Sequence, residues 1–297
     1  MFAVGARCEE GNPSDETPTL NQDIPPDPPP WGAFAEHERV RDLSREVSNQ
    51  TDDTILRESA RLGPLVGQFL QAARAHIAPT VTTQSLAELL LEECRRADLA
   101  PAMLGYQGFP AGVAISINDE IVHGIPSSRA LQRGDLVKIE LAVVSGKAFA
   151  AQSWTFPVGP PSATDAPMLA AGRTALTHAV NAVSPRARLG DIGAAIQTTT
   201  EAAGFSVVRA YVGYGMGKQR LQQPQVSGFG RAGTGSRLLP GMILNIHVII
   251  KQGSFEVAIA PNKWTAMAVD GLRGALFTAM VEVTAGGRAR LTNDLDM

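Results

Sequence analysis

Residues 204–250 read "GFSVVRAYVGYGMGKQRLQQPQVSGFGRAGTGSRLLPGMILNIHVII", and they decide the fold of the 297-residue chain. The stretch predicts a strand, a glycine-rich turn, a long polar loop, and a second strand that carries His247 in an apolar run. A helix is predicted just before it, over Asp191 to Ala203, and Gly204 is the residue type that most often follows a helix. The stretch therefore belongs to a unit in which strands follow helices.

The same order of helices and strands occurs twice along the chain. In the first half, Asp53 or Thr54 is expected to cap a helix with apolar residues at a 3.6-residue period, and Thr83 to cap the next helix. The segments "GVAISIN" and "DLVKIELAVV" predict the strands that follow. In the second half, a helix over Met168 to Val183 precedes the helix that ends at Gly204, and strands are expected in "SVVRAYV", "MILNIHVII" and "ALFTAMVEVT". Two such halves predict an internally duplicated α+β fold, in which helices cover one face of a curved antiparallel sheet.

Residues 1–50 differ in composition from the rest of the chain. Their segment "NPSDETPTLNQDIPPDPPPWGAF" is rich in proline and acidic residues and nearly lacks aliphatic ones. We therefore expect a disordered N-terminal extension over 1–50 and one folded domain over 51–297. An alternative interpretation makes the extension a docking segment for a protein partner, anchored by Trp31 and Phe34.

Composition and charge exclude several classes of protein. The chain is 44% hydrophobic and 19% charged, which is ordinary for a globular protein. Its net charge of −3, without a long basic run, argues against a nucleic-acid partner. The two cysteines, Cys8 and Cys94, show neither a disulfide framework nor zinc-ligand spacing. No apolar signal segment or membrane-length run is present, so the sequence predicts a cytoplasmic protein without membrane contact.

Seven short motifs, in a fixed order, point to a known family. They are "GYQGFP", "INDEIVHGIP", "GDLVKIELAV", "TFPVG", "RLGDIGAAIQ", "GFSVVRAYVGYGMG" and "LPGMILNIHVII". Through these motifs the chain from about Ile55 to Thr292 resembles the methionine aminopeptidases. The resemblance implies the pita-bread fold and a reaction in which a two-metal site hydrolyses the bond after an N-terminal methionine.

The resemblance also implies five metal ligands: two aspartates, a histidine and two glutamates. The residues at the matching positions are Glu140, Ala151, Tyr214, His247 and Thr278. A histidine beside the family's metals is replaced by Leu221, whereas His123 in "VHGIP" is kept from a position that contacts the substrate. Two divalent ions need several anionic oxygen ligands and an open coordination position. We therefore expect no metal and no other cofactor; a single zinc ion on His123, Glu140 and His247 is the alternative.

Four ionisable side chains map into one cavity of the resembled fold and form the predicted catalytic set. They are His123, Glu140, Tyr214 and His247, which together can donate and accept protons. The predicted substrate-binding residues are Tyr106, Gln107, Phe109, Trp154, Leu221, Trp264 and Thr278. Two alternatives stay open: Tyr214 as a space-filling replacement for a lost histidine, and His247 as an ordinary core residue.

Three functions are compatible with these residues. The preferred hypothesis is a metal-free acid/base enzyme that acts on a small molecule, for instance in specialised metabolism, by C–N or C–O hydrolysis, elimination or cyclisation. The second is a catalytically inactive binding or scaffold protein. The third is a metalloaminopeptidase with a rebuilt site. An open cavity with imidazoles on its wall would favour catalysis, whereas a filled cavity would favour binding through the outer surface.

Overall fold

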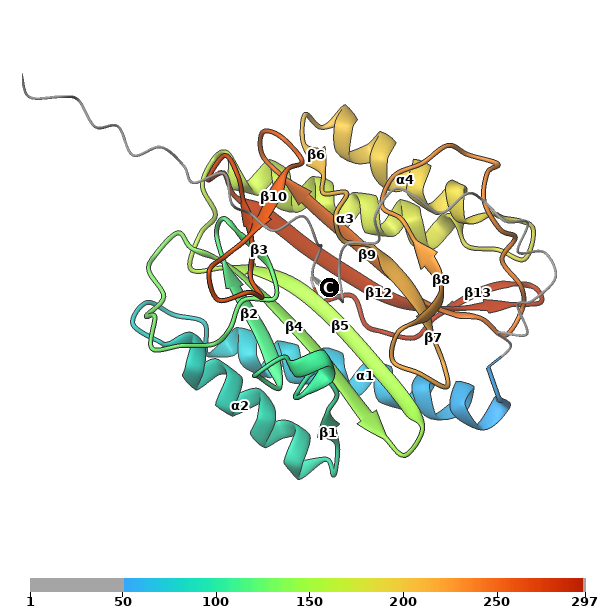
Figure 1. Ribbon diagram of the computed structural model, residues 1–297, viewed down its shortest axis with the longest axis horizontal. Helices are drawn as coiled ribbons and strands as arrows, with labels where there is room; N and C mark the ends of the chain where they lie inside the picture. Colours follow the sequence, from blue (N-terminus) through green and yellow to red (C-terminus); the bar gives the residue numbers. More distant parts are fainter. Residues whose placement is uncertain (1–50, 296–297) are drawn as a thin grey trace, which may run out of the picture.

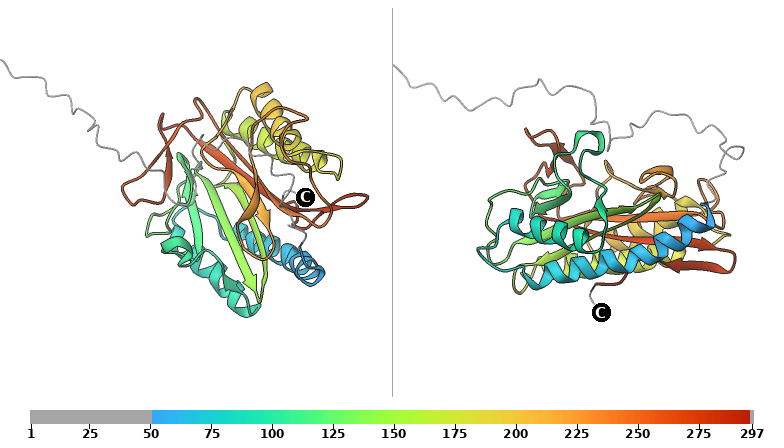
Figure 2. Two further views of the ribbon diagram at one scale, coloured as in Figure 1. Left: turned by 45° about the vertical axis from the view of Figure 1, so that its right-hand side comes forward. Right: turned by 90° about the horizontal axis from the view of Figure 1, so that it is seen from below.

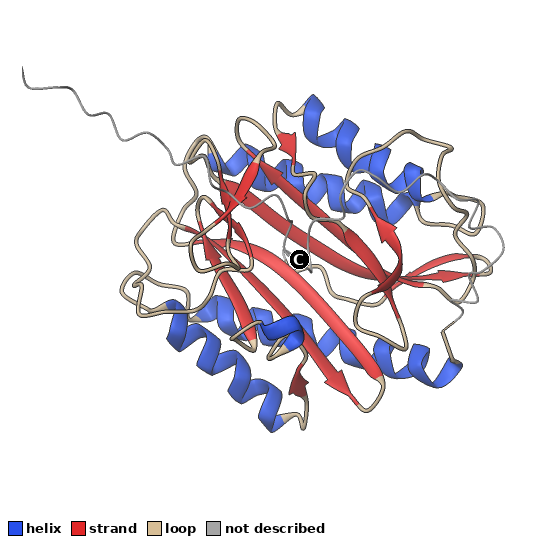
Figure 3. Ribbon diagram, in the orientation of Figure 1, coloured by secondary structure: helices blue, strands red, loops and turns tan. Residues whose placement is uncertain are grey.

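The computed structural model describes residues 51–295, so the extension predicted over residues 1–50 lies outside the described residues. In the face-on view, helices flank the central strands on two sides (Figure 1 and Figure 3). Seen from below in Figure 2, the long helices lie together on one side of the strands. None of the helices in the described part of the chain is long and apolar enough to cross a bilayer.

The two halves of the fold contain corresponding elements. The first half consists of α1 (Asp53–Ala75), α2 (Thr83–Arg96), β1 (Ala100–Pro101), the 3₁₀ turn η2 (Tyr106–Gly108), β2 (Val113–Ile117), β3 (Glu120–Val122), β4 (Leu136–Ser145) and β5 (Ala148–Pro157). The second half consists of α3 (Asp165–Ala182), α4 (Leu189–Ala202), β6 (Ser206–Val207), β7 (Gly213–Met216), β8 (Gln222–Val226), β9 (Ile243–Lys251), β10 (Val257–Ile259), β11 (Ala266–Ala268), β12 (Gly274–Thr284) and β13 (Gly287–Arg290).

Each half builds its own antiparallel sheet. The first is four-stranded, with the order β1-β4-β2 and with β5 paired to β4. The second is six-stranded, with the order β13-β12-β9-β7-β8 and with β6 paired to β9. A small three-stranded sheet, β10-β11-β3, joins an element of the first half to two of the second. The predicted pita-bread architecture of helices over curved antiparallel sheets is confirmed.

Side chains join the two large sheets where β5 and β12 run side by side across the centre of the molecule (Figure 1). Thr155 Oγ1 donates to Leu276 O at 2.9 Å and accepts from Leu276 N–H at 2.8 Å. Two residues along, Thr278 Oγ1 accepts the N–H of Ser153 at 2.8 Å. These bonds satisfy main-chain groups that face across the seam, and buried polar groups left without partners are costly. The two halves are therefore held at a fixed distance, which matters because the candidate site lies between them.

The helix caps, Asp52 and Thr82, lie just before the predicted caps, Asp53 or Thr54 and Thr83. Asp52 caps α1 by accepting the N–H of Thr54 at 2.7 Å, and Thr82 caps α2 by accepting the N–H of Ser85 at 3.1 Å. Ser, Thr, Asp and Asn at this position satisfy a free N–H group of the first helical turn. Because several cap-forming residues follow one another at both places, the sequence alone does not choose between them.

The predicted strand "SVVRAYV" is largely wrong. Only Ser206 and Val207 form a strand, β6, which pairs with one end of β9, and pairing resumes at Gly213 as β7 near the other end. Val208 N–H still donates to Ile249 O at 2.9 Å, but the chain beyond it leaves the sheet, and Tyr211 reaches the wall of the candidate pocket. Apolar character predicted a continuous strand here, whereas the chain uses part of that segment to line a site.

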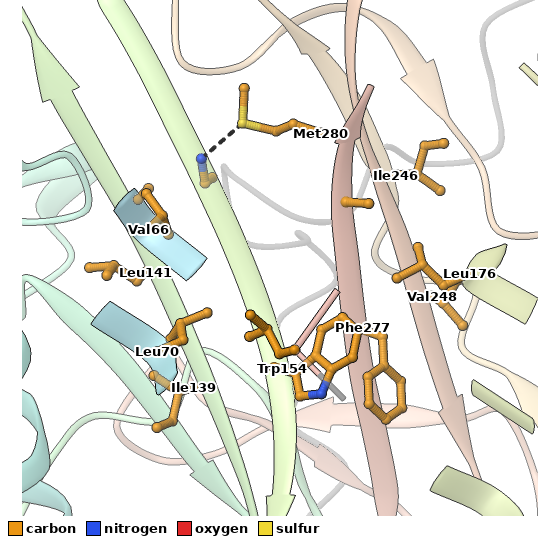
Figure 4. Packing of buried hydrophobic residues seen from close by; sticks show 14 of the residues in the cluster. Val66, Leu70, Ile139, Leu141, Trp154, Leu176, Ile246, Val248, Phe277 and Met280 are labelled. Carbon is orange, nitrogen blue, oxygen red and sulfur yellow. Dashed lines mark hydrogen bonds between the residues drawn. The ribbon is translucent and has the colours of Figure 1, made fainter. Parts of the chain in front are cut away.

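The core between the sheets and the helices is closely packed (Figure 4). Trp154 of β5 is 1% exposed, and its ring meets that of Phe277 of β12 edge to face, with centroids 5.0 Å apart. Val66 and Leu70 of α1 and Leu176 of α3 belong to the same cluster. Edge-to-face aromatic pairs add about 0.5–1.5 kcal/mol beyond the burial of their area.

A buried lysine in the first sheet provides a pH test of the fold. Lys138 of β4 is fully buried, and its Nζ donates to Asn118 O at 2.9 Å and Gly274 O at 3.3 Å. Burial lowers the pKa of Lys138 to about 7. Below pH 7 the folded and unfolded states both hold the proton, and the buried charge costs stability in full. Above pH 7 the folded state releases the proton, while the unfolded state keeps it to about pH 10.

We therefore expect the wild-type protein to gain about 2 kcal/mol of unfolding free energy between pH 7 and pH 9, relative to Lys138→Met. Urea unfolding at several pH values measures this difference. Lys147→Met, at an exposed position in the turn between β4 and β5, should follow the pH dependence of the wild type. If the unfolding free energies of the wild type and Lys138→Met changed in parallel with pH, the prediction would be contradicted.

Candidate functional site

A concave site lies between the two halves. Strands β4 and β5 of the first sheet and β7 and β9 of the second form its walls, and the segments around residues 103–109 and 219–225 form its rim. The cavity has a volume of about 380 Å³. This volume falls within the range of small-molecule and short-peptide sites, which combine apolar walls with a few polar groups.

Most of the residues predicted from the sequence line this pocket. They are Tyr106, Gln107, Phe109, His123, Glu140, Tyr214, Leu221, His247 and Trp264. The structure therefore brings together all four members of the predicted acid/base set. Ala151 also lines the pocket. The cavity is open, although Leu221 and Tyr214 stand on its wall.

Trp154 and Thr278 were predicted as ligand contacts, but the structure does not place them on the pocket wall. Successive side chains of a strand point to opposite faces, so Ser153 faces the pocket while Trp154 packs into the core. Thr278 is fully buried opposite His247 in the β9–β12 ladder, and its hydroxyl accepts the N–H of Ser153. Both residues are buried behind the strands that form the pocket wall.

His123 and Glu140 form the first polar pair of the pocket. Glu140 Oε1 accepts the main-chain N–H of His123 at 2.7 Å, and Glu140 Oε2 lies 4.0 Å from His123 Nε2. His123 has a φ of 59°, in the left-handed region that a non-glycine residue adopts only at a cost. The bond to the buried carboxyl offsets part of that cost and fixes where the imidazole points.

Burial sets the protonation states of this pair. It raises the pKa of Glu140 to about 7, against the opposing effects of the His123 N–H, Arg220 and Lys138. It lowers the pKa of His123 to about 3, and the charge of Arg220 and the neighbouring His247 add to this shift. At neutral pH the imidazole is therefore uncharged and the carboxyl is close to half-protonated. Such a carboxyl can donate or accept a proton near pH 7.

The second polar cluster lies on β7 and β9. Asn245 and His247 are two residues apart on β9 and share a face, and Asn245 Nδ2 donates to the hydroxyl of Tyr214 at 3.2 Å. The rings of Tyr214 and His247 are 5.1 Å apart. Burial raises the pKa of Tyr214, while burial and the charge of Arg220 lower the pKa of His247 to about 3.

The surroundings of Tyr214 and His247 bear on two alternatives: Tyr214 as a space-filling residue and His247 as an ordinary core residue. Both Tyr214 and His247 line the pocket. His247 Nε2 is buried and has no hydrogen-bond partner among residues 51–295. A core histidine usually satisfies its ring nitrogens, so this position is not that of an ordinary core residue.

Several polar residues of the pocket were not predicted from the sequence, among them Asn245, Arg220 and Tyr211. Asn245 lies two residues before His247, and strand alternation was the signal that would have found it. Arg220 and Tyr211 lie in irregular segments, where no periodicity predicts the direction of a side chain. Arg220 stands over the ring of Tyr106, with its Cζ 4.2 Å from the ring centroid.

The donors of the pocket do not fit a two-metal centre. Across residues 51–295, no group of three or more His, Cys, Asp or Glu side chains is arranged to hold a metal ion. Among the described residues that line the pocket, Glu140 is the only carboxylate, and Ala151 offers no donor atom. Hard divalent ions prefer several oxygen ligands, which this set does not supply.

Comparison with known proteins places this pocket in a family. A model of the metallopeptidase family M24 matches residues 56–285. The chain belongs to this family. It is 35% identical to methionine aminopeptidase 1 of Bacillus subtilis over 238 residues, which cover 80% of the chain and 95% of the relative. It is 38% identical to methionine aminopeptidase A of Synechocystis over 231 residues, covering 76% and 91%.

Solved structures agree with the family assignment. The methionine aminopeptidase of Thermotoga maritima superposes with a TM-score of 0.81 at 31% identity, over 82% of this chain and 99% of that one. These findings contradict the expectation of a repurposed, metal-free acid/base enzyme of specialised metabolism, or of a pseudo-metallopeptidase. The family is one of metallopeptidases, and the relatives are named methionine aminopeptidases. The expectation was wrong because differences at the ligand positions do not by themselves imply a new reaction.

Proposed function

We propose that this M24 protein receives the N-terminal residue of a peptide in the pocket between its two halves. One observation carries the proposal. The relatives are named for an action on methionine, and the pocket of this chain joins an apolar wall to a polar one. Phe109 and Trp264, with ring centroids 5.2 Å apart, belong to the apolar side together with Met103. An unbranched side chain such as methionine fits irregular apolar surroundings well.

The polar wall would hold the peptide end itself. Glu140 and His247 present acceptor atoms, and the neutral imidazole of His123 can accept or donate one hydrogen bond. A bound ammonium group favours the ionised carboxylate, so binding would lower the pKa of Glu140 from about 7. The seam between β5 and β12 keeps these groups in place on opposite walls.

The proposal does not depend on a bound metal ion. At the positions that the resemblance matches to ligands, Ala151 has no donor atom, and the Thr278 hydroxyl is bonded to Ser153. The donors that remain do not form a group able to hold an ion. In this proposal, side chains of the pocket therefore hold the peptide end without a metal ion.

Hydrolytic removal of the N-terminal residue with a divalent metal is the second candidate. It is favoured by the family match and by the names of the relatives. In such enzymes a bound ion lowers the pKa of water to about 7 and supplies the nucleophile. Here the donor set gives no support for a particular ion.

The peptide Met-Ala-Ser tests both candidates. We expect it to bind in isothermal titration calorimetry. Its N-acetylated form should bind with an affinity at least about 10-fold lower, because acetylation removes the charged amino group. Equal affinities, or no binding of either peptide, would contradict the proposal. Release of methionine in the presence of manganese or cobalt, abolished by a chelator, would establish the second candidate.

A further inference from the structure

One cation of the pocket has no role in the recognition of a peptide amino group. Arg220 is the only arginine or lysine on the wall that the described residues form. Its Nε is buried without a hydrogen-bond partner among residues 51–295, and the guanidinium takes part in none of the ion pairs found there. Its Cζ lies over the ring of Tyr106, 4.2 Å from the centroid, and this cation–π contact holds the guanidinium at the rim.

The groups around Arg220 do not neutralise it. The two imidazoles, His123 and His247, stay uncharged because burial and Arg220 itself lower their pKa values to about 3. Glu140 is only partly ionised at pH 7, since burial raises its pKa to about 7. A guanidinium keeps its proton at any physiological pH. The pocket therefore carries a positive charge that an anionic group of a ligand would balance.

Guanidinium geometry selects the kind of anion. Arginine presents parallel N–H groups in a rigid plane, which match the two oxygens of a carboxylate. A partly buried cation without a partner is unfavourable, so a ligand carboxylate gains both a strong hydrogen-bonded pair and relief of that cost. A cavity of about 380 Å³ has room for a dipeptide.

We propose that the ligand of this pocket carries a carboxylate, bound by Arg220, and that short peptides are therefore its substrate class. This inference rests on the proposed function, because the amino end is held by the polar wall formed by Glu140 and His247. The carboxylate belongs either to the C-terminus of a dipeptide or to an acidic side chain at the second position.

The experiment compares three ligands of matched size by isothermal titration calorimetry: Met-Ala, Met-Ala amide and Met-Asp amide. Loss of a charge-assisted hydrogen-bonded pair costs about 10- to 100-fold in affinity. We expect Met-Ala to bind the wild-type protein that much more tightly than its amide. Arg220→Gln should remove the difference, and Arg220→Lys should leave part of it, because lysine keeps the charge without the planar pair of donors.

A matched control uses another arginine that stacks on aromatic rings. Arg209 is exposed and lies over Phe255 at 4.4 Å, away from the pocket wall. Arg209→Gln should keep the wild-type preference for the free acid. Tight binding of Met-Asp amide together with weak binding of Met-Ala would assign the carboxylate to the side chain.

Two outcomes would overturn the inference, and each is distinct from failure of the proposed function. Equal binding of all three ligands to the wild type, or an acid preference that persists in Arg220→Gln, would show that Arg220 selects no carboxylate. In both cases sensitivity to N-acetylation would still support recognition of the amino end. Failure of every peptide to bind would reject both proposals together.

Discussion

Replacing Trp154 by alanine should lower the free energy of unfolding by about 3–5 kcal/mol, the usual cost of emptying a buried aromatic site. The indole is 1% exposed, packs edge to face on Phe277, and lies where β5 of the first sheet meets β12 of the second. Its loss leaves a cavity that the strands on either side cannot close without moving the two sheets. Chemical denaturation with a fluorescence or circular dichroism signal measures the change.

Trp264→Ala is the matched comparison, because it removes the same side chain from the pocket wall. Trp264 is partly exposed beside Phe109 and Gly108, so its removal should cost less stability and more peptide affinity than the Trp154 substitution. The pair separates a core tryptophan from a ligand-contacting one. A Trp154→Ala protein of wild-type stability, or a larger loss in Trp264→Ala, would contradict this assignment.

Gly213→Ala should cost about 3 kcal/mol of stability, at the upper end of what overpacking costs. Gly213 begins β7 against β9, and a Cβ atom there would lie 2.3 Å from the main-chain oxygen of Asn245. Main chain cannot give way as a flexible side chain does, so the strands must separate. Because Tyr214 follows directly and pairs with Asn245, the substitution should also weaken peptide binding.

Gly286→Ala serves as the control for this prediction. A Cβ atom at Gly286 would meet no atom within 4 Å, so we expect a change within about 0.5 kcal/mol. Thermal unfolding of both variants, together with calorimetry of peptide binding, measures the two effects. Equal melting temperatures of Gly213→Ala and Gly286→Ala would show that β7 and β9 are less closely paired than the structure indicates.

Much of the site could be predicted because strands and short motifs constrain side-chain positions. His123, Glu140 and His247 lie in or beside regular strands, and the resemblance fixed their places. Trp154 was misplaced because it was assigned by its nearness to a ligand position, although neighbouring residues of a strand face opposite sides. Arg220 was missed because the loop that holds it has no period.

By itself, the sequence determined the two successive sets of helices and strands and the family to which the chain belongs. Local propensity, caps and apolar periodicity act within one helix or strand, so these elements can be predicted without tertiary structure. Only the tertiary structure decided that Thr278 bonds to Ser153 across the seam, and that Arg220 stands over Tyr106. These contacts join residues that are distant in sequence, and their geometry depends on how the two sheets pack. The charge of the pocket depends on burial for the same reason, because the pKa of Glu140 rises to about 7 only once both halves cover it.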